Sequence, residues 1–391
     1  MKETKFKDTE IGKIPEDWEV TPIGKACNVR RGVRVTKEQL TDEGRYPVYQ
    51  NTNYPMGYFD NYNVDANTPF VIVGGSAGQI GLSKERYWAA DDCAYFEKSN
   101  TLNKVFLYYE LTHRQFEIKK FVRTASVPRL DRKVIESFVL PLPSLHEQHR
   151  IASALTSIDN LISSLDKLIE KKKNIKQGTM QQLLTGKTRL KGFSEPWVEK
   201  KLGDVAVNYT GLTYSPMNVK SYGTLVLRSS NIQKGILVFN DNVFVDMDIP
   251  SRAIAKKNDL LICVRNGSKA LIGKSAVITD YADGMAFGAF MTILHANDIQ
   301  QGFLNYLWQA DYIQQQVKDN MGATINQITN ADIEQFKIVV PHSLKEQQAI
   351  ATILTKMDNE ITALEAKKAK YEAIKQGMMQ QLLTGKKRLI S

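Results

Sequence analysis

The chain carries a long internal repeat, and this repeat constrains its fold more than any other feature. Residues 145–190 align with residues 344–389 at a constant offset of 199, without a gap, and 26 of the 46 aligned pairs are identical. Chance does not produce a match of that length, so the chain is a tandem duplication. Its architecture must accommodate two copies of one segment, each joined to a further unit.

Outside the copied segments the duplication is faint. The weak correspondences include Trp18 with Trp197, Gly75-Ser76 with Gly267-Ser268, and Ile80-Gly81 with Ile272-Gly273. We therefore expect two diverged units that alternate with two copied segments. The expected domains are 1–143, 144–187, 188–341 and 342–391.

Both copied segments are expected to be long helices. Their apolar residues recur in alternating steps of three and four, which is the heptad spacing of helices wound around each other. Pro143 and Pro341 precede the segments, and Gly186 and Gly385 stand where a left-handed residue would end a helix. About 40 residues at a rise of 1.5 Å make rods about 60 Å long. The apolar seam consists of Ile151, Leu155, Ile158, Ile162, Leu165, Ile169, Ile350, Leu354, Met357, Ile361, Leu364 and Tyr371.

Lysines interrupt the seam toward the C-terminal half of each rod. They are Lys172 and Lys176 in the first copy, and Lys368 and Lys375 in the second. We therefore expect these halves to pack less tightly, or to pack against another chain. The simplest partner for each rod is the other rod, because a long helix is stabilised by burying its apolar stripe. Two independent helices, each lying on its own unit, remain the alternative.

The diverged units are expected to be mixed α/β. Helical spacing of apolar residues predicts helices within 101–121 and 302–318, and loops of small and polar residues follow at 123–129 and 322–327. Short runs of β-branched and aromatic residues predict buried strands. These strands are 70–73, 260–264, 291–294 and 336–340.

Composition indicates a soluble, basic, cytoplasmic protein. Lys and Arg number 52 against 42 Asp and Glu, which gives a formal charge of +10 and favours a polyanionic partner. The three cysteines lie far apart and form no CxxC pair, which argues against disulfides and thiolate metal sites. No signal-peptide core and no run of 18 apolar residues is present, so we expect no membrane contact.

Three motifs that resemble catalytic sites lack residues their chemistry requires. Gly186-Lys187-Thr188 resembles the end of a phosphate-binding loop, but Gln181 stands where that loop needs a glycine. His146 and His149 are one residue short of the spacing that places two imidazoles on one helical face. Asp131-Arg132-Lys133 has no partner carboxylate. We expect a non-catalytic chain without a metal or cofactor of its own; a self-contained nuclease or methyltransferase remains the alternative.

Polar loops on both diverged units predict contact with nucleic acid. Guanidinium groups suit phosphates and the guanine edge, and amide side chains can read bases, while the net charge supplies affinity. For any single residue, an ordinary exposed loop position is the alternative. The candidate DNA-contact residues are Arg30, Arg31, Arg34, Asn51, Asn53, Gln79, Lys84, Arg86, Arg123, Arg129, Tyr209, Tyr214, Arg228, Asn231, Arg265, Asn266, Lys269, Thr324, Asn326 and Gln327.

One motif occurs at the start of both copied segments. It reads Leu142-Pro143, Leu145, Glu147-Gln148, Ile151, Leu155 and Asp159 in the first, and Pro341, Leu344, Glu346-Gln347, Ile350, Leu354 and Asp358 in the second. The motif resembles a signature of the specificity subunits of type I restriction–modification systems. The order of variable unit and shared helix, twice over the whole chain, resembles that family as well.

The resemblance implies that each diverged unit is a target recognition domain that reads one half of a bipartite site on double-stranded DNA. It implies that the helices pair as an antiparallel coiled coil with pseudo-twofold symmetry. The helices would dock two methyltransferase subunits, which bring S-adenosylmethionine, and restriction subunits would bring ATP-driven translocation and Mg²⁺. A rigid spacer would hold the two readers near one turn of DNA apart, about 34–36 Å. A coiled-coil scaffold whose α/β units bind other proteins remains the alternative.

Overall fold

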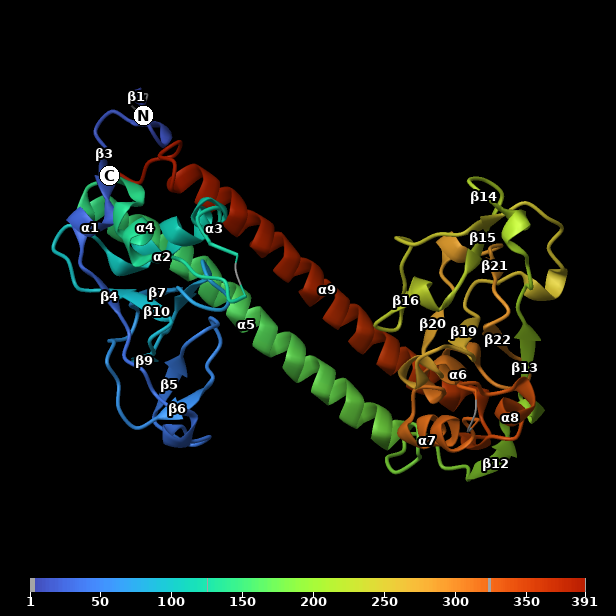
Figure 1. The fold of residues 1–391 in the computed structure, drawn as a ribbon. Helices are drawn as coiled ribbons and strands as arrows, with labels where there is room; N and C mark the ends of the chain where they lie inside the picture. Colours follow the sequence, from blue (N-terminus) through green and yellow to red (C-terminus); the bar gives the residue numbers. More distant parts are fainter. Residues whose placement is uncertain (1–3, 125, 323–324, 391) are drawn as a thin grey trace. The chain divides into compact units, whose positions relative to one another are not determined.

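A computed structural model of the chain describes residues 4–124, 126–322 and 325–390. The chain divides into two compact units, one formed by residues 1–167 with 365–391 and the other by residues 168–364. We call them unit 1 and unit 2. Each combines one diverged part with a piece of both copied segments (Figure 1). Within the described residues no helix has the length and apolar character needed to cross a membrane.

Unit 1 is a mixed α/β unit. Its strands and short helices are β1 (Phe6–Thr9), β2 (Gly12–Pro15), β3 (Glu19–Pro22), α1 (Ile23–Ala26), β4 (Val29–Arg31), β5 (Tyr46–Tyr49), β6 (Gly57–Phe59), β7 (Pro69–Ile72), β8 (Ile80–Leu82), β9 (Trp88–Ala89), β10 (Cys93–Phe96), α2 (Lys104–His113), α3 (Gln115–Lys119), α4 (Arg132–Ser137) and β11 (Val139–Leu142). A four-stranded antiparallel sheet has the order β4-β10-β7-β8, and a three-stranded sheet has the order β6-β5-β9. Strands β3 and β11 pair separately, as do β1 and β2.

Unit 2 is built in the same way. Its elements are β12 (Trp197–Lys201), β13 (Ala206–Thr210), β14 (Val219–Lys220), β15 (Thr224–Leu227), β16 (Ile232–Gln233), β17 (Ile236–Leu237), β18 (Phe244–Val245), β19 (Leu260–Cys263), β20 (Ser275–Val277), β21 (Ala286–Phe287), β22 (Met291–Ala296), α6 (Gln301–Leu307), α7 (Asp311–Asp319), α8 (Asn330–Glu334) and β23 (Lys337–Pro341). The main sheet has the order β13-β22-β19-β20, and a second sheet has the order β14-β18-β15-β21.

The two units repeat one topology although their sequences barely align. The sheet β13-β22-β19-β20 corresponds strand by strand to β4-β10-β7-β8, and the pair β12–β23 corresponds to β3–β11. All four predicted strands form as β7, β19, β22 and β23, with ends within two residues of the prediction. Strands β7 and β19 are buried along their whole length, because both of their faces carry apolar side chains.

One proposed correspondence between the halves is wrong by three residues. Gly78, not Gly81, is the counterpart of Gly273: their φ values are +80° and +81°. Each donates its N–H to the strand before the turn, Gly78 to the Ile72 carbonyl and Gly273 to the Cys263 carbonyl, both at 2.8 Å. Such a turn needs a left-handed residue, which glycine adopts without a steric penalty. The Ile-Gly match in the sequence is therefore coincidental.

Both predicted diverged-unit helices form, but each is broken in two. Arg114 separates α2 from α3, and its guanidinium donates to the Val139 carbonyl and pairs with Glu117. An extended Ala310 separates α6 from α7, just after the Trp308 indole donates to the Gly273 carbonyl at 2.9 Å. Apolar spacing alone does not reveal these breaks, because tertiary hydrogen bonds stabilise them.

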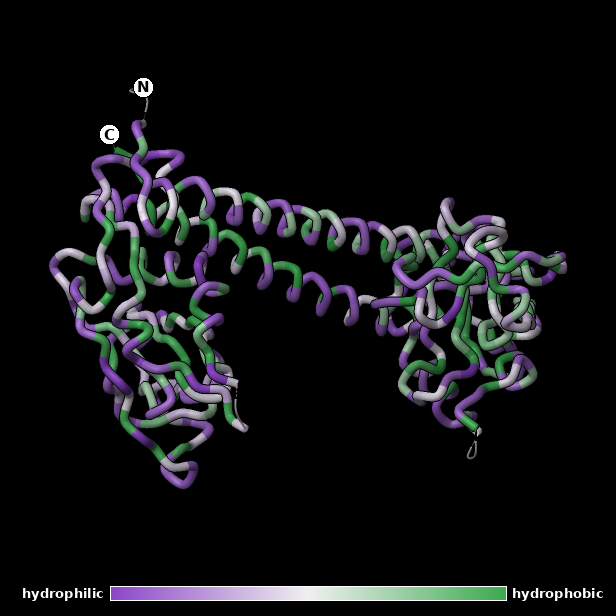
Figure 2. The backbone as a smooth tube through the Cα atoms, turned by 45° about the horizontal axis from the view of Figure 1, so that its top comes forward, coloured by the Kyte–Doolittle hydropathy of each residue, from purple (hydrophilic) through white to green (hydrophobic). Residues whose placement is uncertain are grey.

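The copied segments form two long helices, α5 (Leu145–Leu183) and α9 (Leu344–Leu382). Hydrophilic and hydrophobic positions alternate along both (Figure 2). Each ends ahead of a left-handed glycine, Gly186 or Gly385, with φ of +68° in both cases, as predicted.

All four seam lysines form ion pairs with carboxylates of the other long helix. The Nζ-to-oxygen distances are 2.7 Å for Lys375–Asp159 and 2.6 Å for Lys368–Asp166 in unit 1, and 2.5 Å for Lys176–Asp358 and 2.7 Å for Lys172–Glu360 in unit 2. From Asp159 to Asp166 the chain advances along α5, while the paired lysine moves back along α9 from Lys375 to Lys368. The two ion pairs of unit 2 show the same reversal. The two helical segments therefore run antiparallel within each unit.

The apolar seam residues lie in the interior of their own unit. Ile151 and Leu155 of α5 belong to the unit 1 core together with Leu382 of α9, and Ile350 and Leu354 of α9 belong to the unit 2 core. Of the remaining seam positions, Ile158, Leu165, Ile169 and Ile361 are buried, and Ile162, Met357, Leu364 and Tyr371 are half-buried. Both long helices thus pack against the diverged parts and also form ion pairs with each other, so the alternative of two independent helices is wrong.

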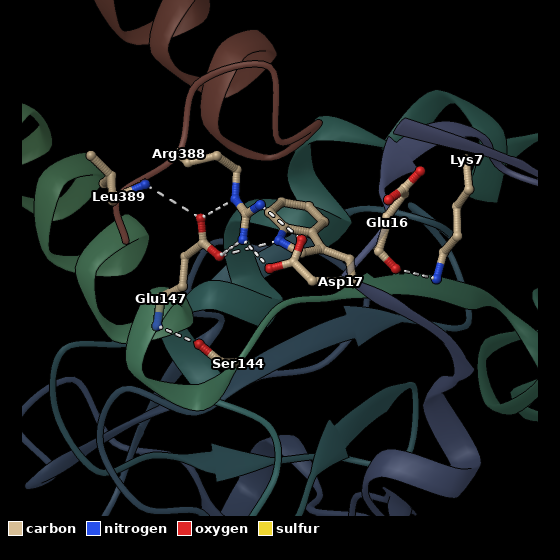
Figure 3. A network of polar contacts seen from close by, with 8 residues as sticks. Lys7, Glu16, Asp17, Ser144, Glu147, Arg388 and Leu389 are labelled. Atoms are coloured by element: carbon tan, nitrogen blue, oxygen red, sulfur yellow. Dashed lines mark hydrogen bonds and ion pairs between the residues drawn. The ribbon is translucent and has the colours of Figure 1, made fainter. Parts of the chain in front are cut away.

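A buried ion pair joins the start of α5 to the residues that follow α9 (Figure 3). Glu147, 1 % exposed, accepts hydrogen bonds from Arg388 Nε at 2.8 Å and Nη2 at 2.7 Å, and from Trp18 Nε1 at 3.1 Å. The same guanidinium binds both oxygens of Asp17 and holds the pKa of that carboxyl below its usual range. Three segments distant in sequence are tied together here.

Unit 2 contains the same arrangement. Glu346 accepts from Arg189 Nε and Nη2, both at 2.8 Å, and from Trp197 Nε1 at 3.4 Å. The neighbouring glutamines are equivalent too: Gln148 donates to the Pro143 carbonyl and Gln347 to the Pro341 carbonyl. The Glu-Gln pair repeated in both copies therefore has a structural role, since it fixes the start of each long helix.

Replacing Arg388 by alanine is expected to destabilise unit 1. The substitution leaves the Glu147 carboxylate buried without its cation, and breaking a buried pair in this way costs about 3–5 kcal/mol. Urea unfolding followed by tryptophan fluorescence measures the change. Arg189→Ala is the matched control and should cost less, because Arg189 is 27 % exposed and Arg388 is 9 % exposed. A loss below about 1 kcal/mol for Arg388→Ala, typical of surface pairs, would contradict this interpretation.

Unit 1 also buries a carboxyl group without a hydrogen-bond partner. Among the described residues, neither side-chain oxygen of Glu110 has one, and the side chain is 1 % exposed. Burial raises its pKa to about 8. Tyr109 and Tyr306 are equivalent, since their hydroxyls donate to Asp159 and Asp358 at 2.8 Å, so the counterpart of Glu110 is Leu307. Unit 2 places an apolar side chain at this position.

Glu110→Leu is expected to stabilise the protein by about 1–3 kcal/mol at pH 7, because it removes an unsatisfied buried polar group. The folded pKa lies above the usual value of 4.5. The native protein therefore binds more protons than the unfolded chain between these pH values, and its stability falls as pH rises from about 4.5 to about 8. Unfolding free energies across that range should show a weaker decline for the variant. An unchanged pH dependence would exclude Glu110 as its source.

Candidate nucleic-acid interface

Candidate residues of unit 1 gather where loops approach Gly74 and Gly75. Arg123 and Arg129 exchange backbone hydrogen bonds of 2.8 and 3.1 Å, which closes the loop after α3. Arg129 Nη1 also bonds Asp92 Oδ1 at 2.6 Å. A Cβ on Gly74 would lie 2.3 Å from Asp92 Oδ1, so a larger residue would displace the Asp92 carboxylate that Arg129 binds. The two arginines therefore project from a closely packed platform.

The loop that contains Asn51 reaches the same place. The Asn51 carbonyl accepts a hydrogen bond from the Ser76 N–H at 2.9 Å, and a Cβ on Gly75 would lie 2.8 Å from the Asn51 Cβ. The Asn53 N–H donates to Gln79 Oε1 at 3.4 Å. Five candidates, Asn51, Asn53, Gln79, Arg123 and Arg129, thus come from loops in direct contact.

The remaining unit 1 candidates are divided. Arg31 donates to the Asp91 carbonyl at 2.7 Å, next in sequence to the Asp92 that Arg129 binds. Arg34 is exposed. Arg30 pairs with Glu97 at 2.8 Å, which raises the pKa of Arg30. Lys84 bonds Asn160 of α5, and Arg86 lies over the Tyr62 ring and near Asp65. The contacts of Lys84 and Arg86 are thus with other parts of the unit.

Unit 2 has a pocket of about 540 Å³ between β15, β22 and their loops. It is lined by two candidates, Tyr214 and Arg228, and by Thr213, Ser229, Ser230, Asp241 and Phe290 among others. Arg228 Nη2 bonds Asp241 Oδ2 at 2.8 Å. Within the described part of the chain, Arg228 Nε and Ser230 Oγ are buried and have no hydrogen-bond partner. The pocket therefore has donors that its own side chains do not use.

The loop after β19 borders this pocket. Asn266 Nδ2 donates to Ser229 Oγ at 3.0 Å, and the exposed Arg265 guanidinium lies 4.9 Å from the centre of the Phe290 ring. Asn326 Nδ2 donates to the Gly267 carbonyl at 2.8 Å, and Gln327 forms a β-bridge with Arg265. Arg265, Asn266, Asn326 and Gln327 thus join Tyr214 and Arg228 in one region.

Three of the described unit 2 candidates do not join this group. Asn231 is fully buried, accepts from the Arg228 N–H and donates to the Val238 carbonyl, so it supports the fold and we leave it out of the interface. Tyr209 lies half-buried on β13, and Lys269 is exposed on a short turn. Thr324 lies outside the described residues.

Sequence patterns did not identify Phe290 or Asp241. Phe290 is 53 % exposed, and the Arg265 guanidinium lies over its ring. It follows Arg265 by 25 residues, and no local motif indicates that the two meet. The region combines guanidinium, amide, hydroxyl, carboxylate and aromatic groups, a mixture suited to base edges as well as phosphates.

Within the described residues, no group of three or more His, Cys, Asp or Glu is placed to hold a metal ion. Glu147, central to the histidine motif, is bound by Arg388. Burial raises the pKa of Cys27 to about 11 and raises that of Cys93 further, so both thiols stay protonated at neutral pH.

Comparison with known proteins gives a consistent result. The family model described as "Type I restriction modification DNA specificity domain" matches twice, over residues 15–177 and 194–376. The MjaVIII type I restriction enzyme specificity subunit of Methanocaldococcus jannaschii is 28 % identical, over 99 % of this chain and 97 % of its own length. A putative MjaX specificity subunit of the same organism is 26 % identical over 99 % and 98 %.

A solved structure shares the fold. The type I restriction–modification S subunit from M. genitalium superposes with a TM-score of 0.68 at 19 % identity, and covers 93 % of this chain and 96 % of that one. At this identity the likeness concerns the fold alone. Taken with the two family matches, it shows that the mixed α/β unit and the long helix recur together in both proteins.

Proposed function

The chain belongs to the family of type I restriction–modification DNA specificity proteins, and on that basis we propose how its parts act. It selects the DNA sequence for a type I complex, and each of its two units reads one half of a bipartite site on double-stranded DNA. The observation that carries this proposal is the double match of the specificity domain, one match in each half of the chain.

The arrangement of each unit supports separate reading. In each unit, polar loops lie beside a four-stranded sheet of corresponding strand order, yet the loops differ. Gly74 and Gly75 pack closely in unit 1, while a pocket opens in unit 2. Two readers of one fold with different loops suit two different half-sites. We propose the unit 1 residues Asn51, Asn53, Gln79, Arg123 and Arg129 and the unit 2 residues Tyr214, Arg228, Arg265, Asn266, Asn326 and Gln327 as the central contacts.

We propose the domain boundaries 1–143, 144–187, 188–341 and 342–391, with α5 and α9 paired as an antiparallel coiled coil. The cross-helix ion pairs in each unit support this pairing. The copied helices dock two methyltransferase subunits, and restriction subunits join that complex. S-adenosylmethionine, ATP and Mg²⁺ belong to those partners, and this chain contributes no catalytic residue.

Methylation mapping tests the proposal directly. The chain is co-expressed with its cognate methyltransferase subunit, and N6-methyladenine is mapped across the host DNA by single-molecule sequencing. We expect one split motif with a constant gap. A stable complex that methylates no split motif would favour the scaffold alternative, and a continuous motif would contradict the assignment of one half-site to each unit.

Arg265→Ala is expected to relax or weaken recognition in one half-site only, because Arg265 belongs to unit 2 and stands beside the exposed Phe290 ring. Loss of one good guanidinium–base contact costs about 1–3 kcal/mol of discrimination. Binding of the complex to DNA variants in each half-site measures the effect. Lys269→Ala, exposed on the same loop region, serves as the control. Equal weakening at both half-sites would assign Arg265 to phosphate contact or to folding.

A further inference from the structure

In unit 1, three residues meet beside the end of β7. The Val73 N–H donates to the Asp92 carbonyl at 2.7 Å, and the Val73 carbonyl accepts from the Leu130 N–H at 2.9 Å. Gly74 follows Val73 and forms a β-bridge with Arg129. These backbone contacts place Gly74, Asp92 and Arg129 next to one another. We call these three residues the unit 1 triplet.

In unit 2, the same backbone contacts hold three different residues. The Val264 N–H donates to the Phe290 carbonyl at 3.0 Å, and the Val264 carbonyl accepts from the Ile328 N–H at 2.9 Å. Arg265 follows Val264 and forms a β-bridge with Gln327. Arg265, Phe290 and Gln327 are the unit 2 triplet. Their counterparts in the unit 1 triplet are, in order, Gly74, Asp92 and Arg129.

Each triplet contains one guanidinium group, but the two groups come from different positions. In unit 1 the guanidinium belongs to Arg129, and its Nη1 bonds Asp92 Oδ1 at 2.6 Å. In unit 2 it belongs to Arg265, and it lies 4.9 Å from the centre of the Phe290 ring. The residue that holds the guanidinium has changed with it, from a carboxylate to an aromatic ring. Both of these groups attract a guanidinium.

Gly74 leaves open the space that the side chains of the unit 1 triplet occupy. A Cβ at Gly74 would lie 2.3 Å from Asp92 Oδ1 and 2.7 Å from Arg129 Nη1. An arginine at this position, as in unit 2, would therefore displace the ion pair. The side chains of a triplet depend on one another, so the two units differ in all three positions together.

Stability does not explain why each triplet has a guanidinium. The backbone hydrogen bonds that join the loops are the same in both units, whichever side chains the loops carry. The Arg129 side chain is 56 % exposed and Arg265 is exposed, and exposed ion pairs and cation–π contacts stabilise a fold little. A guanidinium has five N–H donors, and the bond from Arg129 Nη1 to Asp92 uses one of them. The others are left for a ligand.

We propose that Asp92 and Phe290 are positioning residues for DNA recognition. Each holds the guanidinium beside it, that of Arg129 or Arg265, in the orientation that binds the O6 and N7 atoms of one guanine in the half-site of its own unit. This rests on the proposed function and identifies one base in each half-site. A guanidinium bonds both of these atoms at once, and one already held in place loses less freedom when it binds.

Asp92→Ala and Phe290→Leu test this role in the full-length chain, assembled with its cognate methyltransferase subunit. Affinity is measured for DNA duplexes in which each base pair of the split site is replaced in turn. Each variant should lose about tenfold of its preference for guanine at one position, in a different half-site for each variant. The other positions should keep their preference. Phe290→Tyr retains the aromatic ring and should retain the preference, whereas leucine retains only the apolar bulk.

Double variants distinguish positioning from a structural role. If Asp92 acts through Arg129, the double variant of Asp92→Ala and Arg129→Ala should show the same base preference as Arg129→Ala alone. The same comparison applies to Phe290→Leu with Arg265→Ala. Effects that add, or that weaken binding equally at every position, would overturn the positioning role.

Asp65→Ala is the charge-matched control, because Asp65 is an exposed carboxylate that lies near Arg86, outside the triplet. It changes the net charge as Asp92→Ala does and should leave the base preference unchanged. Unchanged guanine preference in Asp92→Ala or Phe290→Leu would overturn the role of that residue, even when the unmodified complex reads a split site and the proposed function stands. A lost preference for a base other than guanine would overturn the assignment to guanine. No preference for a split site by the unmodified complex would overturn both proposals.

Discussion

Each unit depends on one buried ion pair. It joins a glutamate at the start of one long helix to an arginine beyond the end of the other. Glu147 with Arg388 and Glu346 with Arg189 bring together segments 241 and 157 residues apart. A buried carboxylate is tolerated only when its charge is matched and its oxygens are hydrogen-bonded, and here an indole N–H completes the set. The helix ends can therefore meet in one register only.

Charged groups also set the pairing of the helices along their length. An apolar heptad seam would tolerate a shift by seven residues, because each apolar layer resembles the next. Lys375 with Asp159 and Lys176 with Asp358 remove that freedom, since a shift would separate the charges. The same aspartates accept the hydroxyls of Tyr109 and Tyr306. Helix pairing and the attachment of each α/β unit thus use common residues.

Each α/β unit is attached to the long helices by equivalent contacts, while the loops beside its sheet vary. This combination suits a protein that reads DNA sequence. The sheets, the Glu-Arg pairs and the helix ends are equivalent in the two units, while the loops beside the sheets differ in length and chemistry. Glu110 and Leu307 show that even equivalent buried positions have diverged. In a protein that recognises DNA sequence, selection for new specificity acts on the loops. The sheets and helices only have to hold these loops in position.

The sequence by itself determined the duplication, the two long helices with their left-handed ends, the strands β7, β19, β22 and β23, and the resemblance to a specificity subunit. These are local or repeated patterns, which periodicity and self-comparison detect without tertiary information. Tertiary structure alone decided the breaks at Arg114 and Ala310, the equivalence of Gly78 with Gly273, the burial of Asn231 and the meeting of Arg265 with Phe290. Each of these depends on a contact between residues distant in the chain, or on a backbone angle that such contacts impose. No local pattern encodes which loop a side chain will meet.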